Sequence, residues 1–319
     1  MKIRQFLLSH RKVWISLAVL VVFVGASVYQ SIYANDDGLP TTTVYWLVED
    51  PLQIDRDASW VLPHDGGYLM VTNEGTLACG INAGMSLSFV YTADDAQTKL
   101  LACCACDEDY LILCAGQAES EYLYSLRTVS ADGEMLREIA LPDRYTAYVD
   151  CRMMGNILAL VTETQFLVFS VSDTPQLLFA QDHTGTSPQV CITEDTVLFS
   201  TSEKTQSTLY EYSLTTDTVR TASLAKAPLF ALSAAPDGTD SKYLIGCGTD
   251  LLGLDAQFSI TERFFDLREA WQKSQVDSTF QKTLTQDNIS AVFTDGTILY
   301  ITDINGTVYK FDVFWGDSM

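Results

Sequence analysis

The sequence predicts an all-β protein, a six-bladed β-propeller preceded by one N-terminal transmembrane helix. Three observations lead to this prediction. Six short apolar segments that resemble one another recur along the chain, they are rich in leucine, aromatic and β-branched residues, and an uncharged stretch near the N-terminus has basic residues only on its N-terminal side. Of the 319 residues, 47% are hydrophobic and 19% are charged, which is the composition of a folded chain with a sizeable core.

The first 35 residues have the pattern of a membrane anchor. Residues 1–12 contain four basic side chains and no acidic one, whereas residues 13–35 contain no charge. A stretch of this length and polarity can cross a lipid bilayer about 30 Å thick. Because basic flanks stay in the cytoplasm, we expect a single-pass protein of the cell membrane with a cytoplasmic tail, a signal anchor at 13–35 and an extracytoplasmic body at 36–319. The alternative is a signal peptide that is cleaved after Ala26, which would release a secreted body.

The body is built from a repeat. Each of the six apolar segments has a leucine at its second position, and successive leucines are 40 to 55 residues apart. These leucines are Leu69, Leu111, Leu158, Leu198, Leu244 and Leu299. Turn-forming residues precede most of the segments, and further apolar runs lie before and after them. Four strands in a unit of about 40–47 residues are typical of a propeller blade, and stacking such blades buries both apolar faces of each one.

The last unit of the repeat is one strand short. Only six residues follow its third strand at 307–313, and the segment 42–48 (TTVYWLV) belongs to no unit. We therefore expect that 42–48 pairs with the C-terminal blade and closes the ring, which favours six blades over a seven-bladed alternative. The longest interval between repeats contains residues 265–282, where the spacing of apolar residues predicts a short helix.

One repeat resembles a known superfamily. Residues 295–312 (DGTILYITDINGTVYKFD) are similar to a repeat of the quinoprotein-like propellers, of the PQQ-like or YVTN type, a group that includes outer-membrane assembly scaffolds and pyrroloquinoline-quinone dehydrogenases. This resemblance implies the fold and leaves the function open. Because the sequence lacks the tryptophan docking motifs and the eight blades of the dehydrogenases, we expect no cofactor.

The eight cysteines form no obvious disulfide framework. An even number in an exported protein suggests disulfides, but two of these residues occupy the same repeat position in different units and three fall in first strands. We therefore expect most of them to be small buried thiols. Two alternatives remain, a vicinal disulfide between Cys103 and Cys104, and a zinc site that adds Cys106 but has no clear fourth ligand.

The body is strongly acidic. All 41 acidic residues lie from Asp36 onward together with 15 of the 19 basic residues, so the body has a formal net charge of −26. A body of this charge repels phosphate backbones, which excludes nucleic acid as an expected partner. Many of the carboxylates fall in turns between first and second strands, where we expect solvated turn residues and no metal site.

Candidate binding residues lie in the connections between blades, on the opposite face from these acidic turns. The connections carry Arg56, Arg144, His183 and Lys226, and the predicted short helix carries Trp271. In so acidic a body, basic groups around one channel mouth can receive an anionic ligand or an acidic peptide. The alternative interpretation is that these are solvated loop residues.

The sequence favours a binding function over a catalytic one. We expect a membrane-anchored extracytoplasmic scaffold that binds a protein or another cell-envelope component, because a propeller presents loops on a rigid frame. Three histidines, one of them in the tail, leave little material for histidine-based catalysis. The first alternative is a propeller hydrolase or lactonase with a carboxylate-held metal, for which Asp150 of a first strand is a candidate ligand. The second alternative is a quinone-cofactor oxidoreductase.

Overall fold

A computed structural model of the chain describes most of the body. The chain divides into Met1–Pro40 and Thr41–Met319, and all described residues belong to the second unit. Within the described ranges, every regular element is a β-strand and no helix is long and apolar enough to cross a bilayer. The predicted tail and anchor lie outside these ranges. The described ranges are 44–47, 52–53, 58–64, 66–82, 86–106, 108–172, 174–226, 228–235, 239–266, 289–295, 298–303 and 307–314.

The first three blades are four-stranded antiparallel sheets whose strands pair in chain order. Blade 1 contains β3 (Ala58–His64), β4 (Gly67–Thr72), β5 (Leu77–Ile81) and β6 (Leu87–Thr92). Blade 2 contains β7 (Thr98–Cys106), β8 (Asp109–Ala118), β9 (Glu121–Val129) and β10 (Met135–Ala140). Blade 3 contains β11 (Tyr148–Met154), β12 (Ile157–Thr162), β13 (Gln165–Ser170) and β14 (Gln176–Asp182).

The remaining three blades repeat this plan, and the last one also includes N-terminal strands. Blade 4 contains β15 (Thr186–Ile192), β16 (Thr196–Ser202), β17 (Ser207–Ser213) and β18 (Thr218–Leu224). Blade 5 contains β19 (Ala231–Ala234), β20 (Tyr243–Cys247), β21 (Asp250–Leu254) and β22 (Ile260–Asp266). Blade 6 contains β23 (Ile289–Asp295), β24 (Ile298–Asp303), β25 (Thr307–Phe314), β1 (Val44–Leu47) and β2 (Leu52–Gln53).

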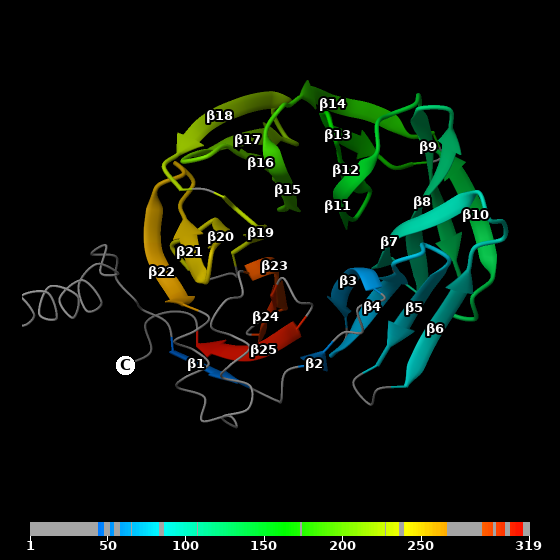
Figure 1. Cartoon of the computed structure of the whole chain (residues 1–319), viewed down its shortest axis with the longest axis horizontal. Helices are drawn as coiled ribbons and strands as arrows, with labels where there is room; N and C mark the ends of the chain where they lie inside the picture. Colours follow the sequence, from blue (N-terminus) through cyan, green and yellow to red (C-terminus); the bar gives the residue numbers. More distant parts are fainter. Residues whose placement is uncertain are drawn as a thin grey trace, which may run out of the picture. The chain divides into compact units, whose positions relative to one another are not determined.

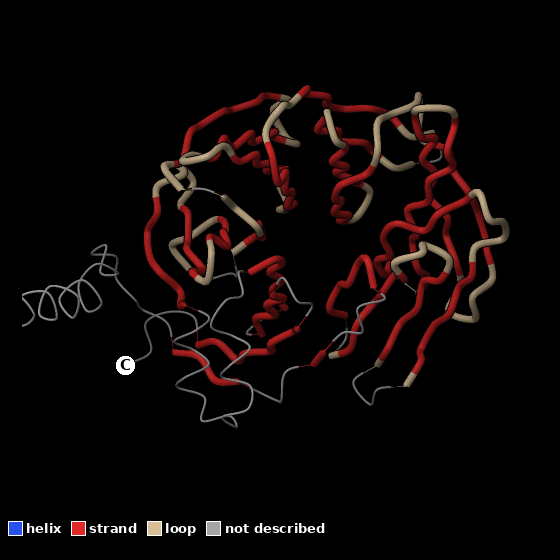
Figure 2. Tube along the Cα trace, viewed as in Figure 1, coloured by secondary structure: helices blue, strands red, loops and turns tan. Residues whose placement is uncertain are grey.

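The six sheets are arranged in a ring with their first strands toward the centre (Figure 1; Figure 2). The first strand of each blade contacts the first strand of the next, and β23 of blade 6 contacts β3 of blade 1, so the contacts run around the whole ring. The predicted six-bladed β-propeller is therefore confirmed. Residues 265 and 266 of the predicted short helix are the last two residues of β22, and the rest of that helix, including Trp271, lies outside the described residues.

The ring is completed by strands from opposite ends of the body. β1 runs antiparallel to β25, with Val44 opposite Phe314 and Leu47 opposite Phe311. The predicted strand at 42–48 is thus observed as β1, the outermost strand of blade 6. The short β2 extends the same edge, because Leu52 lies opposite Val308. The edge of β25, the third strand of blade 6, is thus covered by β1 and β2 and is not left open.

The core lies between neighbouring blades. Between blades 3 and 4, the rings of Phe166 and Phe199 stack with centroids 4.7 Å apart, and Val168 and Val190 pack in the same cluster. The strands in the middle of each blade have neighbours on both faces, and in β16 every residue is buried. This burial explains the nearly continuous apolar runs that marked the repeat in the sequence.

The structure holds all eight cysteines as free thiols, as the repeat positions predicted. Five of them are buried, Cys104 and Cys247 are half-buried, and Cys106 is exposed. Burial raises the pKa of Cys104 and Cys114 to about 12, so these thiols stay protonated near neutral pH. They act as small core residues.

Candidate binding cleft on the loop face

Strands alternate in direction within each blade, so one face of the ring carries both the connections between blades and the turns between second and third strands. We call it the loop face. Arg144, His183 and Lys226 lie in three successive connections on this face, and Arg56 and Trp271 lie outside the described residues. The three described residues differ in exposure: Arg144 is exposed, Lys226 is half-buried, and His183 is 7% exposed.

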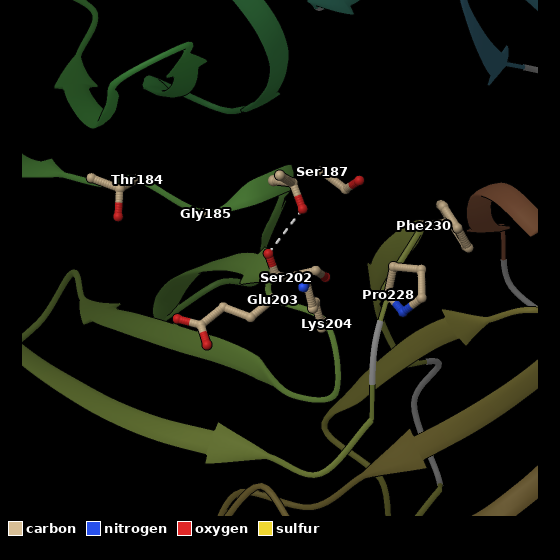
Figure 3. A pocket seen from close by; sticks show the side chains of 9 residues that line it. Thr184, Gly185, Ser187, Ser202, Glu203, Lys204, Pro228 and Phe230 are labelled. Atoms are coloured by element: carbon tan, nitrogen blue, oxygen red, sulfur yellow. Dashed lines mark hydrogen bonds between the residues drawn. The ribbon is translucent and has the colours of Figure 1, made fainter.

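A cleft of about 530 Å³ opens on the loop face at the boundary of blades 4 and 5 (Figure 3). Its volume is within the range of about 300–1,000 Å³ that is usual for ligand sites. Three segments far apart in the sequence form it: the start of β15 with the residues before it, the turn after β16, and the connection that leads to β19. The lining residues are Thr184, Gly185, Thr186, Ser187, Ser202, Glu203, Lys204, Pro228 and Phe230.

Hydroxyl groups hold the walls of the cleft together. Thr186 Oγ1 donates to the carbonyl of Ser202 at 2.9 Å, and Ser202 Oγ accepts from the amide of Leu229 at 3.0 Å. Ser202 Oγ also lies 3.1 Å from Ser207 Oγ, which donates to the carbonyl of Lys226 at 2.7 Å. Both serines are at most 1% exposed. Because these bonds tie the connection to β19 onto blade 4, the cleft is a preformed feature.

The start of β15 departs from regular strand geometry where it lines the cleft. The pairing of β15 with β16 moves from Thr186↔Ser202 to Gln189↔Ser200, so β15 contains a bulge at this point. Ser187 in the bulge has a φ of 48°, in the left-handed region. Bulges re-aim side chains, and strained residues of this kind are concentrated at functional sites.

The segment just before the bulge fits only a glycine. A Cβ atom added to Gly185 would lie 2.4 Å from Thr201 Cβ, far inside normal contact distance. The close approach of this segment to β16 therefore requires the glycine and fixes one wall of the cleft.

His183 packs against blade 3 instead of facing solvent. Its Nε2 atom lies 3.0 Å from the carbonyl of Thr162, and its ring stacks on Phe166 with centroids 4.2 Å apart. Its buried Nδ1 atom has no hydrogen-bond partner among the described residues. Burial lowers the pKa of His183, which keeps the imidazole neutral at neutral pH. The residue predicted as a ligand group therefore presents little of its surface to solvent.

The central channel contains an ion pair at the proposed metal ligand. Arg152 Nη1 lies 2.6 Å from Asp150 Oδ1, and the guanidinium of Arg152 lies over the ring of Phe293 from blade 6, with its carbon 5.0 Å from the centroid. Burial raises the pKa of Asp150, although Arg152 opposes this shift. The Asp150 carboxylate, which the sequence suggested as a metal ligand, is therefore in contact with the Arg152 guanidinium. Across the described part of the chain, no group of three or more His, Cys, Asp or Glu residues is placed to hold a metal ion.

Sequence reasoning missed the ion network that joins blades 4 and 5 on the face opposite the cleft. The carboxylate of Glu211 on β17 accepts from Arg220 Nη2 at 2.6 Å, from Lys242 Nζ at 3.1 Å and from the hydroxyl of Tyr243. Burial alone would raise the pKa of Glu211, but these three donors outweigh it and hold the pKa below the ordinary value. Glu211 and Lys242 are 31 residues apart, and no spacing rule marks such a pair.

Comparisons with known proteins give information about the fold alone. No protein-family model matches the sequence, and no curated protein matches it either. The chain is similar to a catalytically inactive virginiamycin B lyase from Staphylococcus aureus, with 10% identity, 85% of this chain and 99% of that chain covered, and a TM-score of 0.51. It is also similar to a luciferin-regenerating enzyme, with 8% identity, 86% and 96% covered, and a TM-score of 0.50.

A third solved structure, BamB from Moraxella catarrhalis, shares 13% identity over 79% of this chain and 71% of that chain, with a TM-score of 0.46. Identities this low bear on architecture and leave activity open. The fold that the resemblance implied, a β-propeller, is confirmed.

Proposed function

We propose that this chain is a membrane-anchored scaffold that presents its propeller on the extracytoplasmic side and binds a protein or another cell-envelope component at the loop-face cleft. The preformed cleft at the boundary of blades 4 and 5 carries the proposal. The uncharged stretch at 13–35 and its basic flank support the membrane anchor and the orientation.

The cleft suits binding because its walls are fixed before a ligand arrives. The hydroxyl network around Ser202 and Ser207 and the glycine at position 185 hold the three lining segments in place. A preformed site does not have to order its own loops when the ligand binds, which leaves more of the contact energy as affinity. Its lining combines hydroxyl groups, charges of both signs and an apolar wall, as in many sites for polypeptide or small polar ligands.

Site-specific crosslinking in native membranes tests the proposal. A photoreactive phenylalanine derivative at Thr184 on the cleft rim should give a discrete crosslinked product, because Thr184 is exposed and lines the cleft. The matched control places the same group at Thr215, which is exposed in the turn between β17 and β18 on the opposite face. Products that are equal at both positions, or absent at both, would contradict binding at the cleft.

The orientation is tested separately. Protease added outside intact cells or spheroplasts should digest the body, since the basic flank keeps residues 1–12 inside. Full protection of residues 36–319 in this assay would refute the extracytoplasmic location.

A further inference from the structure

We infer that the loop-face cleft binds an extended peptide segment that carries an apolar side chain next to a carboxylate. The inference rests on the proposed function and adds the class of partner. Three features of the cleft carry it: an apolar wall, a bulged strand whose backbone is left out of its ladder, and a lysine without an ion pair.

The apolar wall is formed by the connection that leads to β19. Pro228 is exposed and Phe230 is half-buried, so both can still lose apolar surface to a ligand. The wall is held in place because the amide of Phe230 donates to the carbonyl of Gly246 at 3.0 Å and the amide of Leu229 donates to Ser202 Oγ at 3.0 Å. Burying a medium-sized apolar side chain against such a surface contributes at most about 1.5–3 kcal/mol.

The opposite wall offers polar groups that an extended peptide requires. Ser187 and Pro188 lie in the bulge of β15 and have no register partner on β16 in the described structure. Thr184 and Thr186 next to them are exposed. A peptide backbone loses its water when it enters a cleft, so its amide and carbonyl groups need such partners. This wall can supply the Ser187 backbone and nearby hydroxyl groups.

The charge at the cleft comes from the turn after β16. Lys204 is exposed, and its ammonium group forms no ion pair within the described residues, although the body has a net charge of −26. Glu203, the nearest chain neighbour of opposite charge, accepts from Gln206 Nε2 at 3.2 Å. In Figure 3 the Glu203 carboxylate points away from Lys204 and from Pro228.

A carboxylate on the peptide is the partner that Lys204 lacks. The rest of the acidic body does not prevent this contact, because charges more than about 8 Å apart are largely screened at physiological ionic strength. His183, which is buried against Phe166, is neutral at neutral pH, and the half-buried Lys226 is not among the residues that line the cleft. Lys204 and the apolar wall of Pro228 and Phe230 line the same cleft, so they match a peptide that carries a carboxylate beside an apolar side chain.

Selection from a random peptide library tests this inference on the full chain in detergent micelles. The probe is a library of random dodecapeptides displayed on phage. Peptides enriched on this protein should carry an acidic residue next to an apolar one. A synthetic copy of the most enriched peptide is then labelled, and its affinity is measured by fluorescence anisotropy at two salt concentrations.

Charge variants identify the contact. We expect Lys204→Glu to weaken binding of the synthetic peptide about fivefold, because a rim ion pair contributes up to about 1 kcal/mol. Lys204→Arg should retain more affinity than Lys204→Glu, and higher salt should weaken binding to the unsubstituted chain. The matched control is Lys99→Glu, which makes the same change in net charge on an exposed residue of β7 in blade 2.

Two results would overturn the inference and can be told apart. Enriched peptides without acidic residues, or with equal losses for Lys204→Glu and Lys99→Glu, would refute the acidic peptide while a crosslink from position 184 still supported binding at the cleft. If no peptide is enriched and position 184 gives no specific crosslink, the proposed function fails together with the inference.

Discussion

His183 is a single residue whose burial has a measurable consequence. Its unfolded-state pKa is the ordinary value of 6.5, and burial lowers the folded-state pKa. Between these two values the unfolded chain binds more protons, so stability should fall as the pH drops from 6.5 toward the folded-state pKa. The substitution His183→Gln keeps an amide that can donate to the carbonyl of Thr162 and removes the titrating group.

Urea unfolding of the full chain in detergent at pH 7.5 and pH 5.5 measures this effect. The unsubstituted chain should lose more stability between the two pH values than the His183→Gln variant. Carboxylates such as Glu211, whose pKa is held low, titrate below this window in the folded state and are common to both proteins. An equal loss in the two proteins would contradict a buried neutral imidazole.

Arg152 and Asp150 allow a second test at the residue scale. Their side chains are 18% and 15% exposed, so Arg152→Met leaves a largely buried carboxylate without its partner. Removal of one member of such a pair costs about 3–5 kcal/mol. We expect the loss to be smaller at low pH, because a protonated Asp150 no longer needs the guanidinium.

The double variant Asp150→Asn/Arg152→Met is the control. It removes both charges, so it should be more stable than Arg152→Met alone at neutral pH. Denaturant midpoints at pH 7 and pH 4 decide the matter. A single variant as stable as the unsubstituted chain would show that the pair is dispensable.

At the scale of elements, the closing strand β1 gives the sharpest prediction. Four residues of β1 face β25 in antiparallel register. A chain that starts at Glu49 lacks them and leaves β25 with most of its edge open. Loss of these hydrogen bonds should cost about 4 kcal/mol, at about 1 kcal/mol each. That corresponds to a melting temperature roughly 10 °C lower, and the open edge should promote aggregation.

Two matched chains complete this experiment. One starts at Asp36 and keeps the whole closing strand, and the other starts at Thr42 and lacks only the residues before it. These two should melt together, well above the chain that starts at Glu49, in differential scanning calorimetry. Equal melting temperatures for the chains that start at Asp36 and Glu49 would refute closure by β1.

The strands could be predicted from the sequence and the cleft could not, for a physical reason. A blade is stabilised by local antiparallel pairing and by burial of both faces. Each unit therefore needs the same apolar run, and a buried leucine such as Leu69 or Leu198 identifies this run in the sequence. The cleft depends on a bulge at Ser187 and on the connection to β19, which contacts blade 4 only in the folded ring. The sequence places His183 in a connection between blades, but its burial depends on the partner Phe166 in another strand.

At the scale of the whole molecule, all eight cysteines are free thiols, so no disulfide stabilises the ring. Its stability comes from packing between blades and from ion networks. Neighbouring blades are joined by apolar clusters and by groups such as Arg127, which contacts Glu138 and, across the boundary of blades 1 and 2, Asp94. Its guanidinium is 7% exposed and also donates to the hydroxyl of Tyr91 at 2.8 Å. These contacts do not depend on the redox state of the compartment.

The thiols should therefore behave as core side chains even in an oxidising compartment. In the native protein at pH 8, iodoacetamide should label Cys106 quickly, because this thiol is exposed, and the buried thiols slowly, because they are enclosed and protonated. In denaturant without reductant, mass spectrometry should count eight alkylated cysteines. A reductant should not change the melting temperature. Three or four disulfides in protein isolated from its membrane would contradict these expectations, because they would mean that covalent crosslinks, and not packing between blades, hold the ring together.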